Sequence, residues 1–510
     1  MSSTSLALER ADHVAAILDT AAQLHLPEVL ERHLGSHGLH RGISNGWLAT
    51  VWIACMLSEQ EHRKSGVRAW AERHGHLLER RLPQPLRPVE FSDGRLGIVL
   101  RRFTQTTTWE ALEAELWQCA HRKTGERVTG VRLETTTIPG SCPPGRETDA
   151  EAYLRLTLAT AHRSGRVLAC EISPHPSSAA GARALVRRVR SLLGRSGLLF
   201  VGGGELAALE TRAEIVAQGD HYLVSLPADA PLGEDSELRR RHLARPIDSD
   251  GQALGVGYEF GQPLEAELAA RRVSWTERVQ EVRSPSLMCR EWEEMEARLT
   301  KAEQALRALT PPPGRGRRQF QDEAMLGAAV TRVLEQFGVA GLLDVCWHRE
   351  EKTVVRYIGR GRGGPMRPTC RETRVCLAIQ EVKRREASIQ QARERLGWRA
   401  QATSLPAQVL PLAEAVAYCQ DDEGAGRGPS LLRDTPLQKA LQHVRREDQL
   451  VGLGRLLMVA LWLRPWVHHS PPDRAPWADP PLHLAEAGRT ATRYDERKTG
   501  ILDPVGARSV

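Results

Sequence analysis

The expected fold is decided by Gly197-Leu-Leu-Phe-Val-Gly-Gly-Gly-Glu-Leu-Ala-Ala-Leu-Glu-Thr-Arg212. Its apolar start predicts a short buried β-strand, and three consecutive glycines end that strand before a helix begins. Many enzymes of polyphosphate chemistry have an acidic residue at such a strand end. Here the strand ends in glycine, so the stretch predicts an α/β core that lacks this acid.

The segments before this stretch predict three strands and a helix. The strands are expected at 128–138, 153–160 and 165–172, with a turn at Gly165, and the helix at 179–193. One more strand is expected at His221–Leu226. A strand meander followed by helix, strand and helix is the order of the ribonuclease-H-like fold. Apolar residues at helical spacing between Glu9 and His76 predict an all-helical region in front of it.

The composition narrows the class of protein. The chain has 510 residues, which predicts about three or four domains. Its 70 Lys and Arg against 63 Asp and Glu give a net charge of +7 and a pI near 9.0, which favours an anionic partner. Nine scattered cysteines without a CxxC pair argue against a disulfide framework or a zinc module. We expect no signal peptide, no membrane-spanning segment and a cytoplasmic location.

The region between Ala228 and Ala407 has a different pattern. Trp292, Met295, Leu299, Ala302, Leu306 and Leu309 follow a seam of alternating three- and four-residue spacing that ends at three prolines, 311–313. With a second helix at 325–337, this seam predicts an intramolecular helical hairpin, because it is too short for a dimeric coiled coil. The segment 359–364 is expected to be a basic loop, with Arg360 and Arg362 as possible phosphate contacts.

Four blocks of the chain resemble the DDE transposases of bacterial insertion sequences, in the insertion-sequence-four superfamily. The blocks are Phe91-Ser-Asp-Gly-Arg-Leu96, Arg132-Leu-Glu-Thr-Thr-Thr137, the stretch 197–212, and a C-terminal block anchored on Leu412-Ala-Glu-Ala-Val416 and Pro436-Leu437. In the most similar branch the first strand carries Leu-Asp-Thr-Thr-Thr and the second catalytic block reads Val-Gly-Asp. The resemblance implies a mixed α/β fold, with a ribonuclease-H-like core interrupted by an inserted domain and flanked by helical regions.

The resemblance implies five regions. They are a helical, DNA-binding region at 1–125, the first part of the core at 126–227, the inserted domain at 228–407, the C-terminal helical part of the core at 408–468, and a tail rich in proline and charge at 469–510.

The resemblance also implies which residues would form the active site. The family holds Mg²⁺ with three carboxylates, and the matching positions here are Glu134, Gly203 and Gly426. Glu134 would be a metal ligand, whereas the two glycines vacate their positions. Glu205, Asp422 and Glu423 are the neighbouring acids that could replace them. Catalysis is therefore expected to be impaired, with Mg²⁺ as the cofactor only if activity remains.

The implied partner is double-stranded DNA at terminal inverted repeats, and a homodimer is compatible with the family. Five arginines are expected to contact phosphates, namely Arg433 at the family's signature lysine, Arg445, Arg446, Arg360 and Arg362. When bound to DNA the protein would be associated with the nucleoid. Besides an impaired transposase, two readings stay open: a catalytically inactive DNA-binding regulator and a decayed copy without a role.

Overall fold

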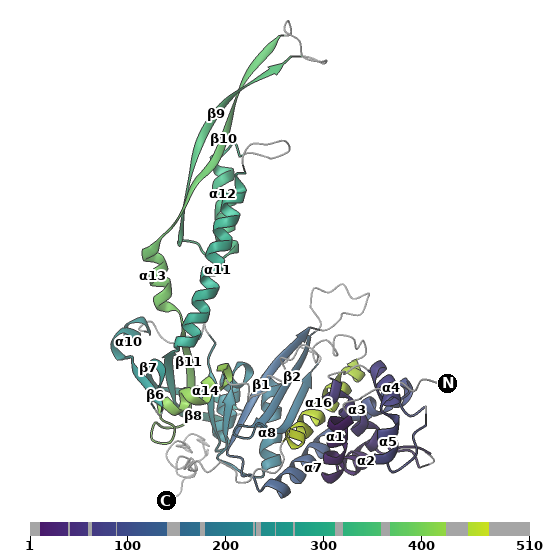
Figure 1. Ribbon diagram of the computed structural model, residues 1–510. Helices are drawn as coiled ribbons and strands as arrows, with labels where there is room; N and C mark the ends of the chain where they lie inside the picture. The colour runs from purple at the N-terminus through teal and green to yellow at the C-terminus, as the bar shows by residue number, and fades with distance from the viewer. Residues whose placement is uncertain are drawn as a thin grey trace, which may run out of the picture. The chain divides into compact units, whose positions relative to one another are not determined.

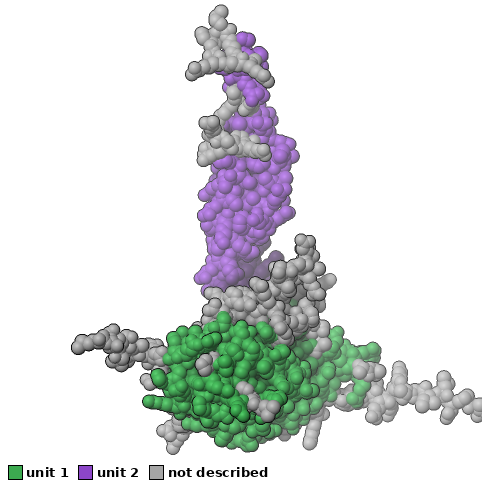
Figure 2. All heavy atoms as spheres, turned by 90° about the vertical axis from the view of Figure 1, so that its right-hand side faces the viewer, with its two compact units in different colours: residues 1–234, 259–280, 400–510 green, residues 235–258, 281–399 purple. Residues whose placement is uncertain are grey.

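The computed structural model describes residues 11–468 except for 39–40, 60–63, 88, 140–152, 174–178, 228–229, 231–235, 250, 269–270, 312–319, 359–367 and 425–446. It divides into two compact units (Figure 2). Unit 1 comprises 1–234, 259–280 and 400–510, and unit 2 comprises 235–258 and 281–399. The predicted insert, 228–407, contains all of unit 2 together with three pieces of unit 1, 228–234, 259–280 and 400–407.

Unit 1 begins with a helical region (Figure 1). Its helices are α1 (Ala11–Gln23), α2 (Leu26–Leu34), α3 (Asn45–Glu59), α4 (Lys64–Arg73), α5 (Gly75–Arg81), α6 (Asp93–Phe103) and α7 (Thr106–Thr124). The late helix α16 (Glu447–His468) completes their apolar core and packs against α3, α6 and α1. Among the described residues, α16 contains the one stretch long and apolar enough to span a membrane, Gln449–Val467, and 67% of it is buried inside the protein.

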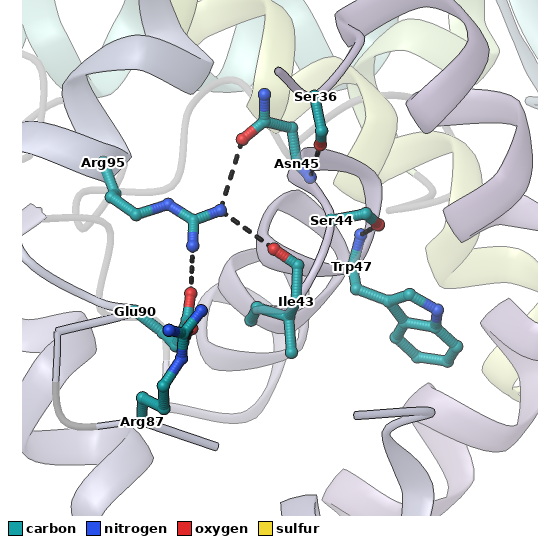
Figure 3. A network of polar contacts seen from close by, with 8 residues as sticks. All are labelled: Ser36, Ile43, Ser44, Asn45, Trp47, Arg87, Glu90 and Arg95. Atoms are coloured by element: carbon teal, nitrogen blue, oxygen red, sulfur yellow. Dashed lines mark hydrogen bonds and ion pairs between the residues drawn. The ribbon is translucent and has the colours of Figure 1, made fainter. Parts of the chain in front are cut away.

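A buried ion pair fastens two loops of this helical region (Figure 3). The carboxylate of Glu90 is fully buried and pairs with Arg95 and with Arg87, the latter at 3.0 Å. Arg95 also donates to the carbonyl oxygen of Ile43 at 2.9 Å. A side chain at Gly42 would collide with the Glu90 carboxylate. Arg95, which belongs to the N-terminal block of the family resemblance, therefore has a structural role in this unit.

Among the residues that the structure describes, the larger sheet has nine strands in the order β3-β2-β1-β4-β5-β11-β8-β7-β6, and β9 and β10 form a separate two-stranded sheet. The bounds of these nine strands are β1 Gly130–Pro139, β2 Tyr153–Ala161, β3 Val167–Ser173, β4 Leu199–Gly202, β5 His221–Ser225, β6 Arg245–Ser249, β7 Gln252–Leu268, β8 Arg271–Arg283 and β11 Trp398–Thr403. Strands β1, β2 and β3 form an antiparallel meander, and β4 and β5 continue from β1 in parallel. The protein is thus a mixed α/β protein with a large mixed sheet, and the predicted meander, helix, strand and helix are confirmed.

Helices cover both faces of the sheet in unit 1. Helices α8 (Ala179–Leu193) and α9 (Leu209–Ala217) pack on one face, with the apolar side chains of β1, β4 and β5 between them. On the other face α16 covers β2 and β3, while α14 (Leu412–Gly424) covers β4 and β5. Strand β4 is therefore buried on both faces, as its continuous apolar sequence predicts.

A second buried acid joins the helical region to the sheet. Glu113 of α7 accepts a hydrogen bond from the backbone N–H of Cys170 on β3 at 2.7 Å and pairs with Arg188 of α8 at 3.1 Å. Burial raises the pKa of the Glu113 carboxyl to about 7, against the opposing effects of Arg188 and the Cys170 N–H. Arg188 also pairs with Glu171 at 3.0 Å.

Unit 2 is built on a helix pair and a long β-ribbon. Its elements are α10 (Ser236–Leu243), β6, the first half of β7, the end of β8, α11 (Pro285–Leu309), α12 (Glu323–Gln336), β9 (Leu343–Tyr357), β10 (Thr369–Arg384) and α13 (Glu386–Arg395). Met295, Leu299, Ala302 and Leu306 of α11 pack with Leu326 and Val330 of α12. The predicted intramolecular helical hairpin is confirmed.

Candidate active site

The first two positions of the expected acid set lie side by side at one edge of the sheet. Strands β1 and β4 are parallel neighbours, and their register pairs Leu133 with Gly202. The next residues along the two strands are Glu134, which is half-buried, and Gly203. Ser225, the last residue of β5, lies on the other side of Gly203. Glu134, Gly203 and Ser225 therefore form a row along the carboxyl edge of three adjacent strands.

Gly203 and Gly202, the residue before it at the end of β4, are under different constraints. A Cβ at Gly202 would lie 2.5 Å from the carbonyl oxygen of Leu133, so the close approach of β1 and β4 requires glycine there. A Cβ at Gly203 would lie 3.6 Å from the Cβ of Ser225, which is an ordinary van der Waals contact. The φ of Gly203 is −143°, a value that any residue adopts. The backbone at 203 therefore accepts a side chain, although the sequence places none there.

The nearest described acid beyond Gly203 is engaged in an ion pair. Glu205 lies in the short 3-10 helix η1 (Gly204–Ala207) and pairs with Arg155 of β2. Both side chains are largely shielded from solvent, at 15% and 27% exposure. A carboxylate held by a guanidinium is a poor candidate to replace an acid at 203, because a metal ion would have to displace Arg155.

The helix that leads to the third expected position is anchored on β1. Arg132 of β1 is buried and donates to the carbonyl oxygen of Tyr418 on α14 at 2.8 Å. The His162 ring stacks on the Tyr418 ring with centroids 4.3 Å apart. Burial, and then the charges of Arg132 and Arg163, lower the pKa of His162 to about 4. A neutral His162 accepts a hydrogen bond from Arg132 at Nδ1, at 3.3 Å.

Several expected site residues lie outside the described residues, so their roles stay predictions. These are Gly426 of the acid set and the arginines Arg433, Arg445, Arg446, Arg360 and Arg362. Asp422 and Glu423 belong to the last turn of α14, but the positions of their side chains are not described.

The described carboxylates do not fit a two-metal centre. In the described ranges, no three His, Cys, Asp or Glu side chains gather closely enough to hold a metal ion. At the row itself Glu134 has a glycine beside it, and Glu205 is committed to Arg155. Two bridged cations need several shared carboxylate oxygens, which one glutamate does not supply.

A basic hollow at the opposite end of β4 was not singled out from the sequence. Its volume is about 530 Å³, and it is lined by Arg187, Arg190, Ser191, Gly194, Arg195, Ser196 and Gln218. The arginines also fasten neighbouring elements: Arg187 pairs with Glu214, and Arg190 pairs with Asp220 at 3.0 Å. The signal in the sequence is the density of arginine between 187 and 195.

No family model matches the sequence, and no curated protein matches it. Among solved structures, the chain is similar to a piggyBac transposase in a synaptic complex with hairpin DNA, with 7% sequence identity and a TM-score of 0.25. The match covers 54% of this chain and 56% of the transposase. The chain spans about half the length of that solved transposase chain.

Proposed function

We propose that this chain is a transposase-like protein that binds double-stranded DNA but does not cut it. In this proposal unit 1 contains a ribonuclease-H-like core of the kind used by insertion-sequence transposases. The support is the strand order β3-β2-β1-β4-β5, with an antiparallel meander followed by two parallel strands and with α8 between β3 and β4. The target would be the terminal inverted repeats of an insertion sequence.

The observation that carries the proposal is the position of Gly203 next to Glu134. In a ribonuclease-H-like core the acids of the first and fourth strands lie at one edge, so that both reach the same metal ions. Here the first acid is a glutamate and the second is absent. The longer side chain of Glu134 moves its carboxylate by roughly one ångström relative to aspartate, and catalytic geometry tolerates little such displacement.

DNA binding does not depend on this acid set. Phosphate contacts come from Arg and Lys side chains, and they fix affinity and its salt dependence without a metal ion. A protein with this net charge can therefore retain its affinity for DNA after losing cleavage. This favours a role as an inactive DNA-binding regulator that competes with an intact relative for the same ends.

The first experiment measures binding and cleavage with the same full-length protein. We expect duplex DNA to be bound with an affinity that falls as salt rises, by about 0.9 in the log–log slope for each phosphate contact. We expect no nicking of a supercoiled plasmid carrying the candidate ends with Mg²⁺ or Mn²⁺. Reproducible nicking that is abolished by Glu134→Gln would contradict the proposal, and so would the absence of DNA binding at low salt.

A second experiment restores the missing carboxylate. Gly203→Asp should fold like the parent, because a Cβ at 203 meets only an ordinary contact with Ser225. With Glu134 beside it, the new aspartate should raise the affinity for Mn²⁺ about tenfold in titration calorimetry, equivalent to about 1.4 kcal/mol. Gly203→Asn is the matched control, because it has the same shape without the charge. An equal affinity of the two variants would show that 203 does not face Glu134.

A further inference from the structure

The basic hollow of unit 1 lies where α8 and α9 end, and its lining is entirely polar. Three arginines, two serines, one glutamine and one glycine surround a volume of about 530 Å³. Of the described residues, none with a carboxylate or an apolar side chain belongs to this lining. Pockets for drug-like molecules are lined predominantly by hydrophobic and aromatic side chains. The composition of this hollow therefore favours a polar, anionic ligand.

The acids that pair with two of these arginines are shielded from solvent. The side chain of Glu214, the partner of Arg187, is 12% exposed, and that of Asp220, the partner of Arg190, is fully buried. Arg187 itself is 58% exposed. Arg190 also donates to the backbone and side-chain oxygens of Gln218, at 2.6 and 3.3 Å. These contacts fix the two guanidiniums in advance, which lowers the entropy that a ligand must overcome to order them.

The third arginine of the lining, Arg195, has no such acid. Its Nη1 donates to the carbonyl oxygen of Val128 at 3.2 Å, and no carboxylate of the described residues forms an ion pair with it. Burial, and then the positive charge of the exposed Arg127, lower the pKa of Arg195, against the attraction of Asp220. Arg195 therefore combines a partly buried guanidinium with a second arginine close enough to repel it.

The positive charges around the hollow outnumber the negative ones. Glu126, the acid next to Arg127 in the sequence, is itself paired with Arg166 at 3.5 Å. That leaves four guanidiniums against two carboxylates, namely Arg127, Arg187, Arg190 and Arg195 against Glu214 and Asp220. An anion in the hollow would compensate this excess.

We propose that the basic hollow binds a phosphate group. The planar guanidinium of arginine matches the geometry of phosphate oxygens and donates to two of them at once. The hydroxyl groups of Ser191 and Ser196, both exposed in the lining, add neutral donors. The proposed function does not require this site, and the phosphate has two sources: the backbone of duplex DNA and a free phosphorylated small molecule.

Ser191 offers a matched pair of variants for the test. Its side chain is exposed on α8 and lines the hollow. Ser191→Glu introduces a carboxylate among the arginines, whereas Ser191→Gln introduces a side chain of nearly the same size without the charge. Neither variant removes an arginine or its ion pair, so both should unfold at the temperature of the parent.

Two probes distinguish the sources of the phosphate, both with full-length protein. Inorganic pyrophosphate is titrated by calorimetry, and a short DNA duplex is titrated by fluorescence anisotropy. We expect Ser191→Glu to weaken the binding of at least one probe about tenfold, and Ser191→Gln to change it less than about threefold. Arg195→Ala should weaken the same probe about tenfold and, for the duplex, reduce the log–log salt slope by about 0.9. The control is Arg332→Ala, an exposed arginine of α12 outside the hollow, which should bind like the parent.

The outcomes separate this site from the proposed function. A loss confined to pyrophosphate would identify a free phosphorylated ligand, and a loss for the duplex would identify the DNA backbone. Equal losses for Ser191→Glu and Ser191→Gln, or for Arg195→Ala and Arg332→Ala, would overturn the inference, because neither would depend on charge in the hollow. Unchanged binding of both probes by Ser191→Glu would also overturn it, even if DNA is bound elsewhere. Failure of the parent to bind the duplex would end the proposed function, whereas pyrophosphate binding that Ser191→Glu abolishes would leave this site standing.

Discussion

The loops around Glu90 and the sheet edge at Gly203 both belong to unit 1, but a carboxylate matters differently in each. At Glu90 the acid is fully buried and pairs with two arginines, and the neighbouring Gly42 has no room for a side chain. At the edge, position 203 has room for a side chain and carries none. The fold therefore depends on the carboxylate of Glu90, whereas it does not require a carboxylate at position 203. The difference distinguishes a carboxylate that stabilises the structure from a position where an acid would be needed only for catalysis.

The largest expected effect on the free energy of unfolding follows from removal of the buried Glu90 carboxylate. Glu90→Ala leaves Arg95 shielded from solvent without its partner, which should lower the free energy of unfolding by about 3–5 kcal/mol. The measurement is the urea midpoint of the transition that reports the helical region. The control is Glu72→Ala, which breaks the exposed pair with Arg68 and should cost about 0.3–0.5 kcal/mol. If both variants lose equally little, the network at Glu90 does not hold the loops.

The next effect depends on pH and concerns the other buried acid. The pKa of Glu113 is raised to about 7, so between about pH 4.5 and 7 the folded protein binds a proton that the unfolded chain does not. This contribution favours the folded state at low pH and is lost as the pH rises through 7. Relative to the parent, Glu113→Gln should therefore gain about 3 kcal/mol between pH 4.5 and 8.

The comparison with the parent is needed because two histidines act in the opposite sense. Burial lowers the pKa values of His162 and His221 to about 4, so both favour the folded state as the pH rises from 4 to 6.5. These contributions are common to parent and variant and cancel in the difference. A difference in stability that stays constant across the pH range would mean that Glu113 is already ionised at pH 5.

A smaller effect distinguishes the two adjacent glycines at the sheet edge. Gly202→Ala forces a Cβ against the Leu133 carbonyl and should cost about 1–3 kcal/mol. Gly203→Ala should change stability by no more than about 0.5 kcal/mol. Thermal unfolding of the two variants side by side is the measurement. Equal destabilisation would mean that position 203 is as closely packed as 202, and that the edge is part of the scaffold after all.

The smallest effect is expected at Glu134. Glu134→Ala should leave the affinity for duplex DNA unchanged within about twofold, or slightly tighter, because a negative charge is removed from a protein that contacts phosphates. Fluorescence anisotropy at two salt concentrations measures this. A marked loss of affinity would mean that the acid at the edge organises the DNA-binding surface and would weaken the contrast with Glu90.

Patterns within a few residues predicted many strands and helices of unit 1. They did not predict which strands pair across long stretches of sequence. The alternating strands around Leu133 and Leu158 and the glycine-ended strand before Gly203 follow periodicities visible within a few residues. The pairing of β11 with β5 joins Ala402 to Val224 across an intervening unit, and no local pattern encodes it. The β9–β10 ribbon was missed because its charged outer half has no buried face to produce an alternating apolar signal.

The candidate site was predictable to the extent that strand order determines it. A parallel neighbour of β1 brings Gly203 beside Glu134 whatever the side chains are. The ion pair of Glu205 with Arg155 and the stacking of His162 on Tyr418 depend on how loops and helices pack. No residue spacing in the sequence predicts these contacts. The same is true of the Glu90 network, which joins Glu90 and Arg95, around the start of α6, to the loop before α3, about fifty residues earlier in the sequence.

The position of α16 has a consequence for the making of the protein. Met458, Val459 and Ala460 complete the core of the helical region, yet the ribosome synthesises them more than three hundred residues after α7. At about 5–20 residues per second, roughly 20–70 s pass between the end of α7 and the emergence of α16. During that interval the apolar side chains that α16 later covers stay exposed to solvent, although all of unit 2 has already been synthesised. Nascent chains arrested before residue 447 should therefore be the preferred clients of chaperones that bind exposed apolar surface.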